Sequence, residues 1–145
     1  MQVNSKYKLL IASTSTIHGS GYLEYVLNDA VELLATDEIL FIPYARPSGI
    51  SYDEYTELPR KAFAQKKIKV KGIHEFEKPK AAIENAKAIF VGGGNTFLLL
   101  KTLYDLALMD VLRKVVATGT PYMGSSAGSN ITGLSIGTTN DMPIV

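Results

Sequence analysis

The sequence predicts an α/β protein built on a mostly parallel sheet with helices on both faces. Two observations predict this class. Short apolar runs alternate with longer amphipathic stretches along the chain, which is the pattern of strands joined by helices. The runs are also apolar with little interruption, as expected for parallel strands covered on both sides. Such sheets bind ligands beyond the carboxyl ends of their strands, so the loops at that edge are candidate sites.

Five short apolar segments are predicted to be the strands. They are residues 9–12, 39–42, 68–73, 88–91 and 121–123. Pro43 follows the second segment and Gly92 follows the fourth, and both residue types interrupt regular structure. Segment 68–73 alternates apolar residues with lysines, so its lysines are expected on a solvated or edge face.

Five segments are predicted to be helices. They are residues 22–34, 53–65, 80–85, 96–104 and 110–117. Pro59 is unfavourable inside the second of them, because proline lacks an N–H and clashes with the preceding turn. A further helix is expected to begin at Ser126.

Length and composition indicate a single domain spanning residues 1–145. The chain carries 15 Lys and Arg against 14 Asp and Glu, a net charge of +1, so no nucleic-acid partner is expected. It has no cysteine, which excludes disulfides and thiolate chemistry. No spacing of histidines and carboxylates indicates a metal site. The apolar run 9–12 is too short for a signal sequence or a membrane span, so we expect a cytoplasmic protein without a membrane partner.

The most informative motif is Gly124-Ser125-Ser126-Ala127-Gly128. Gly-x-Ser-x-Gly after a strand and before a helix is the pattern of a nucleophile elbow, a strained strand-turn-helix that exposes the serine hydroxyl. Ser126 is therefore the candidate nucleophile, and the N–H of Ala127 is a candidate oxyanion donor. The alternative is that small residues at this turn serve packing alone.

A second oxyanion donor is expected from Gly92-Gly93-Gly94-Asn95, because glycine lets the backbone approach a ligand and turn an N–H toward it. The Asn95 side chain is predicted to bind substrate or to brace the loop. The alternative is a tight strand-to-helix turn in which Asn95 or Thr96 caps the next helix.

Few side chains are available to act as the catalytic base. His18 and His74 are the only histidines, and each is either a base or a structural residue. Asp141 is the only carboxylate after the predicted elbow, and it lies in the polar run 138–143. The alternative interpretation of this run is a surface turn. Arg46 could pair with a substrate carboxylate or be a solvated loop charge.

Taken together, several segments resemble the peptidase E family of aspartyl dipeptidases. The matching segments occur in the same order between Leu9 and Val145, at 42–45, 53–55, 72–74, 91–97, 124–130 and 138–145. Cyanophycinase is similar at the glycine loop and the elbow. The combination is specific, although each segment alone is not.

The resemblance implies a serine exopeptidase, without a cofactor, that releases N-terminal aspartate from dipeptides such as Asp-Leu. Ser126 would attack the scissile carbonyl, and the Gly94 and Ala127 N–H groups would hold the oxyanion. Asp141 matches the acidic residue of the family's charge relay, or shapes the pocket instead. Asn95, Thr138 and Asn140 are predicted to bind substrate.

The family's catalytic histidine lies in an Asn-Pro-His segment that this chain lacks. None of the 19 residues after Ser126 is a histidine, so we expect the amino-terminal portion of a catalytic domain, incomplete at its carboxyl end. Such a chain could be truncated, or be completed by a carboxyl-terminal segment or a homodimer partner. It could also be a shortened relative that binds aspartyl peptides without catalysis, or a cyanophycinase-like hydrolase.

Overall fold

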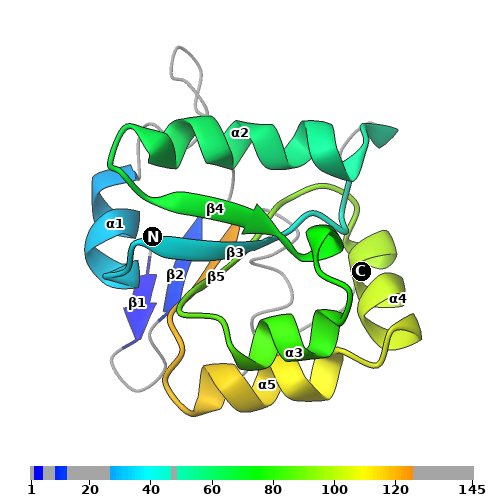
Figure 1. The fold of residues 1–145 in the computed structure, drawn as a ribbon. Coiled ribbons are helices and arrows are strands. Elements are labelled where there is room, and N and C mark those ends of the chain that lie inside the picture. Colours follow the sequence, from blue (N-terminus) through cyan, green and yellow to red (C-terminus); the bar gives the residue numbers. More distant parts are fainter. Residues whose placement is uncertain (1, 5–8, 13–26, 47–48, 126–145) are drawn as a thin grey trace.

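A computed structural model of the protein describes residues 2–4, 9–12, 27–46 and 49–125 (Figure 1). The strands are β1 (Gln2–Asn4), β2 (Leu9–Ala12), β3 (Glu38–Ile42), β4 (Lys69–Gly72), β5 (Ile89–Val91) and β6 (Tyr122–Ser125). The helices are α1 (Leu27–Leu34), α2 (Tyr52–Ala64), α3 (Pro79–Glu84), α4 (Thr96–Asp105), α5 (Met109–Ala117) and the 3₁₀ helix η2 (Ile73–Glu75). Each of the five predicted strands and five predicted helices listed above has a counterpart in this series, whereas the further helix expected to begin at Ser126 lies outside the described residues.

The described strands form one six-stranded sheet in the order β1-β2-β6-β5-β3-β4. All neighbouring pairs are parallel except β1 and β2, which are antiparallel. The predicted mostly parallel α/β sheet is therefore confirmed. The sequence did not indicate β1, because three residues in a polar segment carry little periodic signal. That residues 1–145 are a single domain stays a prediction.

Helices cover both faces of the sheet, with α1 and α2 on one side and α3, α4 and α5 on the other (Figure 1). Each face has its own core because successive strand side chains point to opposite sides. Along β3, Leu40 and Ile42 face α3–α5, whereas Ile39 and Phe41 face α1 and α2. The predicted covering of both faces is thus confirmed.

The structure differs from the sequence prediction at Ile73, and Pro59 does not interrupt its helix. The third predicted strand, 68–73, is shorter as β4, because Ile73 begins η2 instead of continuing the ladder. The second predicted helix, α2, contains Pro59 without ending there. Its start is held by a capping box in which Ser51 and Glu54 bond each other's backbone N–H groups, and its buried side chains pack on the sheet.

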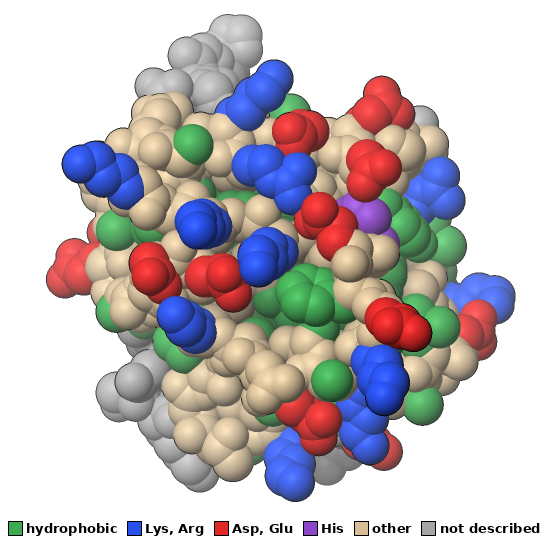
Figure 2. Space-filling model, in the orientation of Figure 1, with side chains coloured by type: hydrophobic (Ala, Val, Ile, Leu, Met, Phe, Trp, Pro, Cys, Tyr) green, Lys and Arg blue, Asp and Glu red, His purple; other side chains and the backbone are tan. Residues whose placement is uncertain are grey.

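The β4 side of the molecule carries charges of both signs (Figure 2). Lys69 and Lys71 are exposed on β4 while Val70 is buried, as the alternation predicted. Lys71 pairs with Glu38 at 3.6 Å, and Arg60 pairs with Glu75 at 2.8 Å. Mixed charges of this kind suit a solvated face.

Replacement of Phe90 tests the core between β5 and the α1–α2 layer. Phe90 is fully buried, and its ring centroid lies 5.1 Å from that of Phe41 and 6.4 Å from that of Phe63. Phe90→Ala should lower the free energy of unfolding by about 3–5 kcal/mol, because it leaves a cavity. Phe97→Ala is the matched control, since Phe97 is 65% exposed, and should change it by less than about 0.5 kcal/mol. Urea unfolding measures both, and equal losses would contradict this packing.

Candidate active site

The candidate site lies where β5 and β6 end side by side. Val91 and Gly124 are register partners across the parallel β5–β6 pair, and Ala12 of β2 pairs with Ser125 on the other side of β6. The last residues of these strands therefore lie at neighbouring points of one sheet edge. The strand that leads into the predicted elbow is confirmed as β6. Ser126, Ala127, Thr138, Asn140 and Asp141 lie outside the described residues, as does His18.

Ser125 is the last residue of β6 and is completely buried. Its hydroxyl has no hydrogen-bond partner among the residues that the structure describes. A substrate carbonyl cannot reach an oxygen enclosed in this way. Of the two adjacent serines, Ser125 thus belongs to the core, and Ser126 remains the candidate nucleophile.

The glycine loop after β5 is held by backbone hydrogen bonds to the end of β3 and to the segment that follows β3. The Gly92 N–H donates to the Ile42 carbonyl at 3.1 Å, and the Asn95 N–H donates to the Ala45 carbonyl at 3.0 Å. Gly92 and Gly93 are buried, whereas Gly94 is exposed. The loop therefore rises from the core to the surface at the carboxyl edge of the sheet.

Gly94 has the properties expected of an oxyanion donor. Its φ of 141° lies in a region that favours glycine. Within the described ranges, its N–H donates to no other group. An exposed amide without a partner can bind a ligand oxygen at no cost to the fold.

Asn95 caps helix α4. Its side-chain Oδ1 accepts a hydrogen bond from the Leu98 N–H at 3.0 Å, which satisfies one of the unpaired donors at the helix start. The capping alternative is thus confirmed. Asn95 is also exposed, so it is accessible to a ligand. Contact between Asn95 and substrate stays a prediction.

His74 lies in η2, directly after β4, and is remote from β6. Strands β3 and β5 separate β4 from β6, a span of about 14 Å at the usual strand spacing. The His74 Nε2 atom lies 2.8 Å from the Asp53 Oδ1 atom, and the ring packs 5.6 Å from that of Tyr52. These contacts favour the structural reading of His74 over a base for Ser126.

Arg46 is engaged by its own loop. Its Nε donates to the Ile50 carbonyl at 3.1 Å and a terminal nitrogen donates to the Gly49 carbonyl at 3.3 Å. The guanidinium also lies 5.1 Å from the centre of the Tyr52 ring, within cation–π range. This arrangement favours a bracing role for Arg46 over pairing with a substrate carboxylate.

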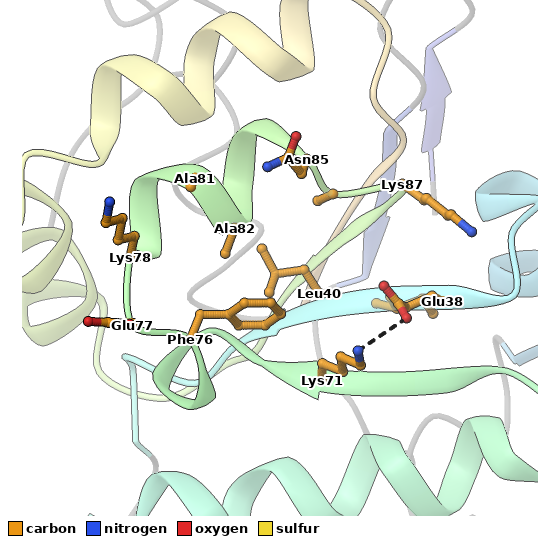
Figure 3. A pocket seen from close by; sticks show the side chains of 12 residues that line it. Glu38, Leu40, Lys71, Phe76, Glu77, Lys78, Ala81, Ala82, Asn85 and Lys87 are labelled. Atoms are coloured by element: carbon orange, nitrogen blue, oxygen red, sulfur yellow. Dashed lines mark ion pairs between the residues drawn. The ribbon is translucent and has the colours of Figure 1, made fainter.

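The described surface also contains a cleft away from this edge. A hollow of about 310 Å³ lies between α3 and the β3–β4 side of the sheet, with Phe76 and Leu40 at its floor and Lys71 and Glu38 paired at its rim (Figure 3). None of the predicted site residues lines it. Within the described ranges there is no cluster of three metal-ligating side chains, and no helix there is long and apolar enough to cross a membrane.

The fold and the β5–β6 edge define an α/β protein in which a glycine loop follows β5 and the Gly-x-Ser-x-Gly motif begins at the end of the adjacent parallel strand β6. The chain belongs to Peptidase family S51, whose sequence model matches residues 9–145. The resemblance to peptidase E is thereby confirmed.

Named relatives support this assignment. The chain is 48% identical over 138 residues to "Peptidase E" of Streptomyces coelicolor, covering 94% of this chain and 56% of the relative. It is 44% identical over 144 residues to the "Probable alpha-aspartyl dipeptidase" of Drosophila melanogaster, covering 97% and 59%. The chain thus spans less than two thirds of the length of these relatives.

A solved structure shares the fold. The crystal structure of a peptidase from an acI-B1 Actinobacterium matches with a TM-score of 0.68 at 19% identity. The match covers 85% of this chain and 55% of that structure.

Tyr55 contacts the glycine loop, and the sequence did not single it out. It lies on α2, is only 2% exposed, and donates a hydrogen bond from its hydroxyl to the Gly93 carbonyl at 2.7 Å. The two residues are 38 positions apart, so no local pattern connects them. The one available signal was that residues 53–55 match the family.

Tyr55 and Phe41 pack so closely against Gly92 that only glycine fits at this position. Replacement of Gly92 therefore tests the geometry of the loop. A Cβ at this position would lie 2.4 Å from the Tyr55 hydroxyl and 2.8 Å from the Phe41 ring. Gly92→Ala should lower the free energy of unfolding by about 1–3 kcal/mol through overpacking. Gly49→Asn is the control, because Gly49 has φ 70° and open space around it, and asparagine tolerates that conformation. Chemical denaturation measures both, and a neutral Gly92→Ala would contradict the packing.

Ionisation of Tyr44 should lower the free energy of unfolding as the pH rises above about 10. Burial raises the pKa of the Tyr44 hydroxyl to about 12, with a further contribution from Tyr52, whereas an unfolded tyrosine titrates near about 10. Above pH 10 the unfolded chain loses this proton first, so the stabilisation present below pH 10 disappears as pH rises to 12. Denaturation between pH 9 and 12 should show a shallower decline for Tyr44→Phe than for the unaltered protein. Parallel declines would contradict this assignment.

Proposed function

We propose that the protein is a serine exopeptidase that hydrolyses dipeptides with N-terminal aspartate, and that Ser126 is its nucleophile. The observation that carries the proposal is the β5–β6 pairing, in which the glycine loop leaves the sheet beside the strand that leads to Ser126. Acyl transfer needs a nucleophile and oxyanion donors close to one carbonyl. Membership of Peptidase family S51 supports the same chemistry.

In the proposed mechanism, Ser126 Oγ attacks the scissile carbonyl and forms a tetrahedral oxyanion. The N–H groups of Gly94 and Ala127 donate to this oxyanion. Gly94 is exposed and its amide donates to no group among the described residues, which supports the first assignment. A base takes the serine proton and returns it to the leaving amine, as in other serine hydrolases. Asp141 is proposed to orient that base or to shape the pocket.

The proposed substrate class is Asp-Xaa, such as Asp-Leu. It rests on relatives named peptidase E and alpha-aspartyl dipeptidase. Asn95, Thr138 and Asn140 are proposed to contact the peptide. A homodimer or a complementing carboxyl-terminal segment is a further proposal, which intact mass and light scattering of the active sample would test.

A second candidate function is binding of aspartyl peptides without turnover. The position of His74 favours this function. Two strands separate His74 from β6, and its ring nitrogen contacts Asp53, so His74 is not placed to act as the base for Ser126. Catalytic residues that act together lose most of their effect when one is missing. On this reading, Asp-Leu would bind saturably and stay intact.

Two adjacent serine replacements test the proposed nucleophile. Asp-Leu hydrolysis is followed for the full-length product of the gene that encodes this sequence, and for its Ser126→Ala and Ser125→Ala variants. Ser126→Ala should lower kcat by at least about 10⁴-fold, because the nucleophile is lost. Ser125→Ala should retain activity, because its hydroxyl is buried and has no partner in the described part of the chain.

The activities of these two variants distinguish the proposed serine peptidase from the alternative binding function. Full activity in Ser126→Ala would refute the serine mechanism, and loss only in Ser125→Ala would move the nucleophile by one residue. Saturable binding of Asp-Leu by calorimetry, with no product, would support the binding module instead. Fluorophosphonate labelling of Ser126, read by mass spectrometry, would independently identify an activated serine.

A further inference from the structure

The hydroxyl of Tyr55 anchors the peptide group that carries the proposed oxyanion donor. Tyr55 Oη donates to the Gly93 carbonyl at 2.7 Å. The Gly93 carbonyl and the Gly94 N–H belong to the same peptide group, which is trans because the described chain contains no cis peptide bond. In a planar trans peptide the C=O and N–H bonds point in opposite directions. A bond that holds the carbonyl toward the core therefore aims the Gly94 N–H toward the surface.

This peptide group needs an anchor because glycine lies on both sides of it. Rotating a peptide plane changes ψ of the residue before it and φ of the residue after it. Glycine accepts nearly all such values at little cost, so the 93–94 peptide could turn over while its neighbours stay in place. The backbone bonds of Gly92 to Ile42 and of Asn95 to Ala45 hold the two ends of the loop, but neither holds this peptide.

Tyr55 is itself held rigidly. Its ring packs edge-on against Phe41, with centroids 5.0 Å apart, and only 2% of the residue is exposed. The missing side chain at Gly92 leaves the space that the hydroxyl occupies. The capping box at Ser51 and Glu54 begins α2 one turn before Tyr55, so the helix start, the ring and the loop form one connected unit.

We propose that Tyr55 is a positioning residue that aims the Gly94 N–H at the developing oxyanion. The inference rests on the proposed function, since it takes Gly94 as an oxyanion donor. Tyr55 touches neither substrate nor the reacting atoms. It acts by excluding the turned-over peptide, in which the Gly93 carbonyl would point at the substrate oxygen and repel its charge.

Removal of one hydroxyl tests this role. Tyr55→Phe keeps the ring and its packing on Phe41 while losing the hydrogen bond to Gly93. Loss of an oxyanion donor lowers kcat by about 100- to 1000-fold, so a donor that is misaimed for part of the time should lower it by about 10- to 100-fold. KM for Asp-Leu should change by less than about threefold, because the bond to the oxyanion forms only in the transition state.

The control is Tyr104→Phe, which removes the same group from an exposed residue on α4 and should leave kcat and KM unchanged. Restoring a donor with Tyr55→p-aminophenylalanine should recover most of the lost kcat. A purely structural role would lower the denaturation midpoint without separating kcat from KM. The rate of fluorophosphonate attachment to Ser126 should fall in parallel with kcat in Tyr55→Phe.

The results distinguish this inference from the proposed function. Hydrolysis lost in Ser126→Ala but unchanged in a folded Tyr55→Phe would overturn the role of Tyr55 alone. Hydrolysis retained in Ser126→Ala would overturn the proposed function first. A fall in kcat that the amino-substituted side chain does not rescue would also overturn the positioning role.

Discussion

The parallel pairing of β5 with β6 is the constraint on which the rest of the site depends. Val91 and Gly124 are opposite each other in this pair, and both strands are buried on both faces. Because side chains alternate along a strand, a register slip of one residue would exchange the two cores that α1–α2 and α3–α5 cover. Because the two cores contain side chains of different size, their packing holds the register. The register in turn brings the glycine loop beside the strand that leads to Ser126.

The glycine loop shows how a flexible sequence is kept in one conformation. Three adjacent glycines carry a large conformational entropy in the unfolded chain, and the loop offers no side chain to pack. Its contacts come from elsewhere: the end of β3, the segment after it, and Tyr55 on α2. Binding energy from a substrate is then not needed to order the loop, which is the benefit of a preorganised site.

The described contacts also distinguish polar groups with structural partners from groups that are available to bind a ligand. His74 is bound to Asp53, Arg46 to loop carbonyls, and Ser125 is enclosed in the core. All three were plausible functional residues by type. Gly94 differs, since its amide is exposed and donates to no group in the described part of the chain. The chain belongs to Peptidase family S51, whereas its activity remains proposed because the chain spans little more than half of its named relatives.

The sequence by itself determined the α/β class, most element positions, the strand before the predicted elbow and the family. These depend on local signals: apolar runs, glycine and proline punctuation, and residue motifs in order. Only the tertiary structure decided the contacts of Tyr55, His74 and Asn95. A hydrogen bond between residues 55 and 93, or a separation of two strands between His74 and β6, depends on strand order and packing. Local periodicity does not predict strand order, because strand order depends on how all the apolar faces are buried together.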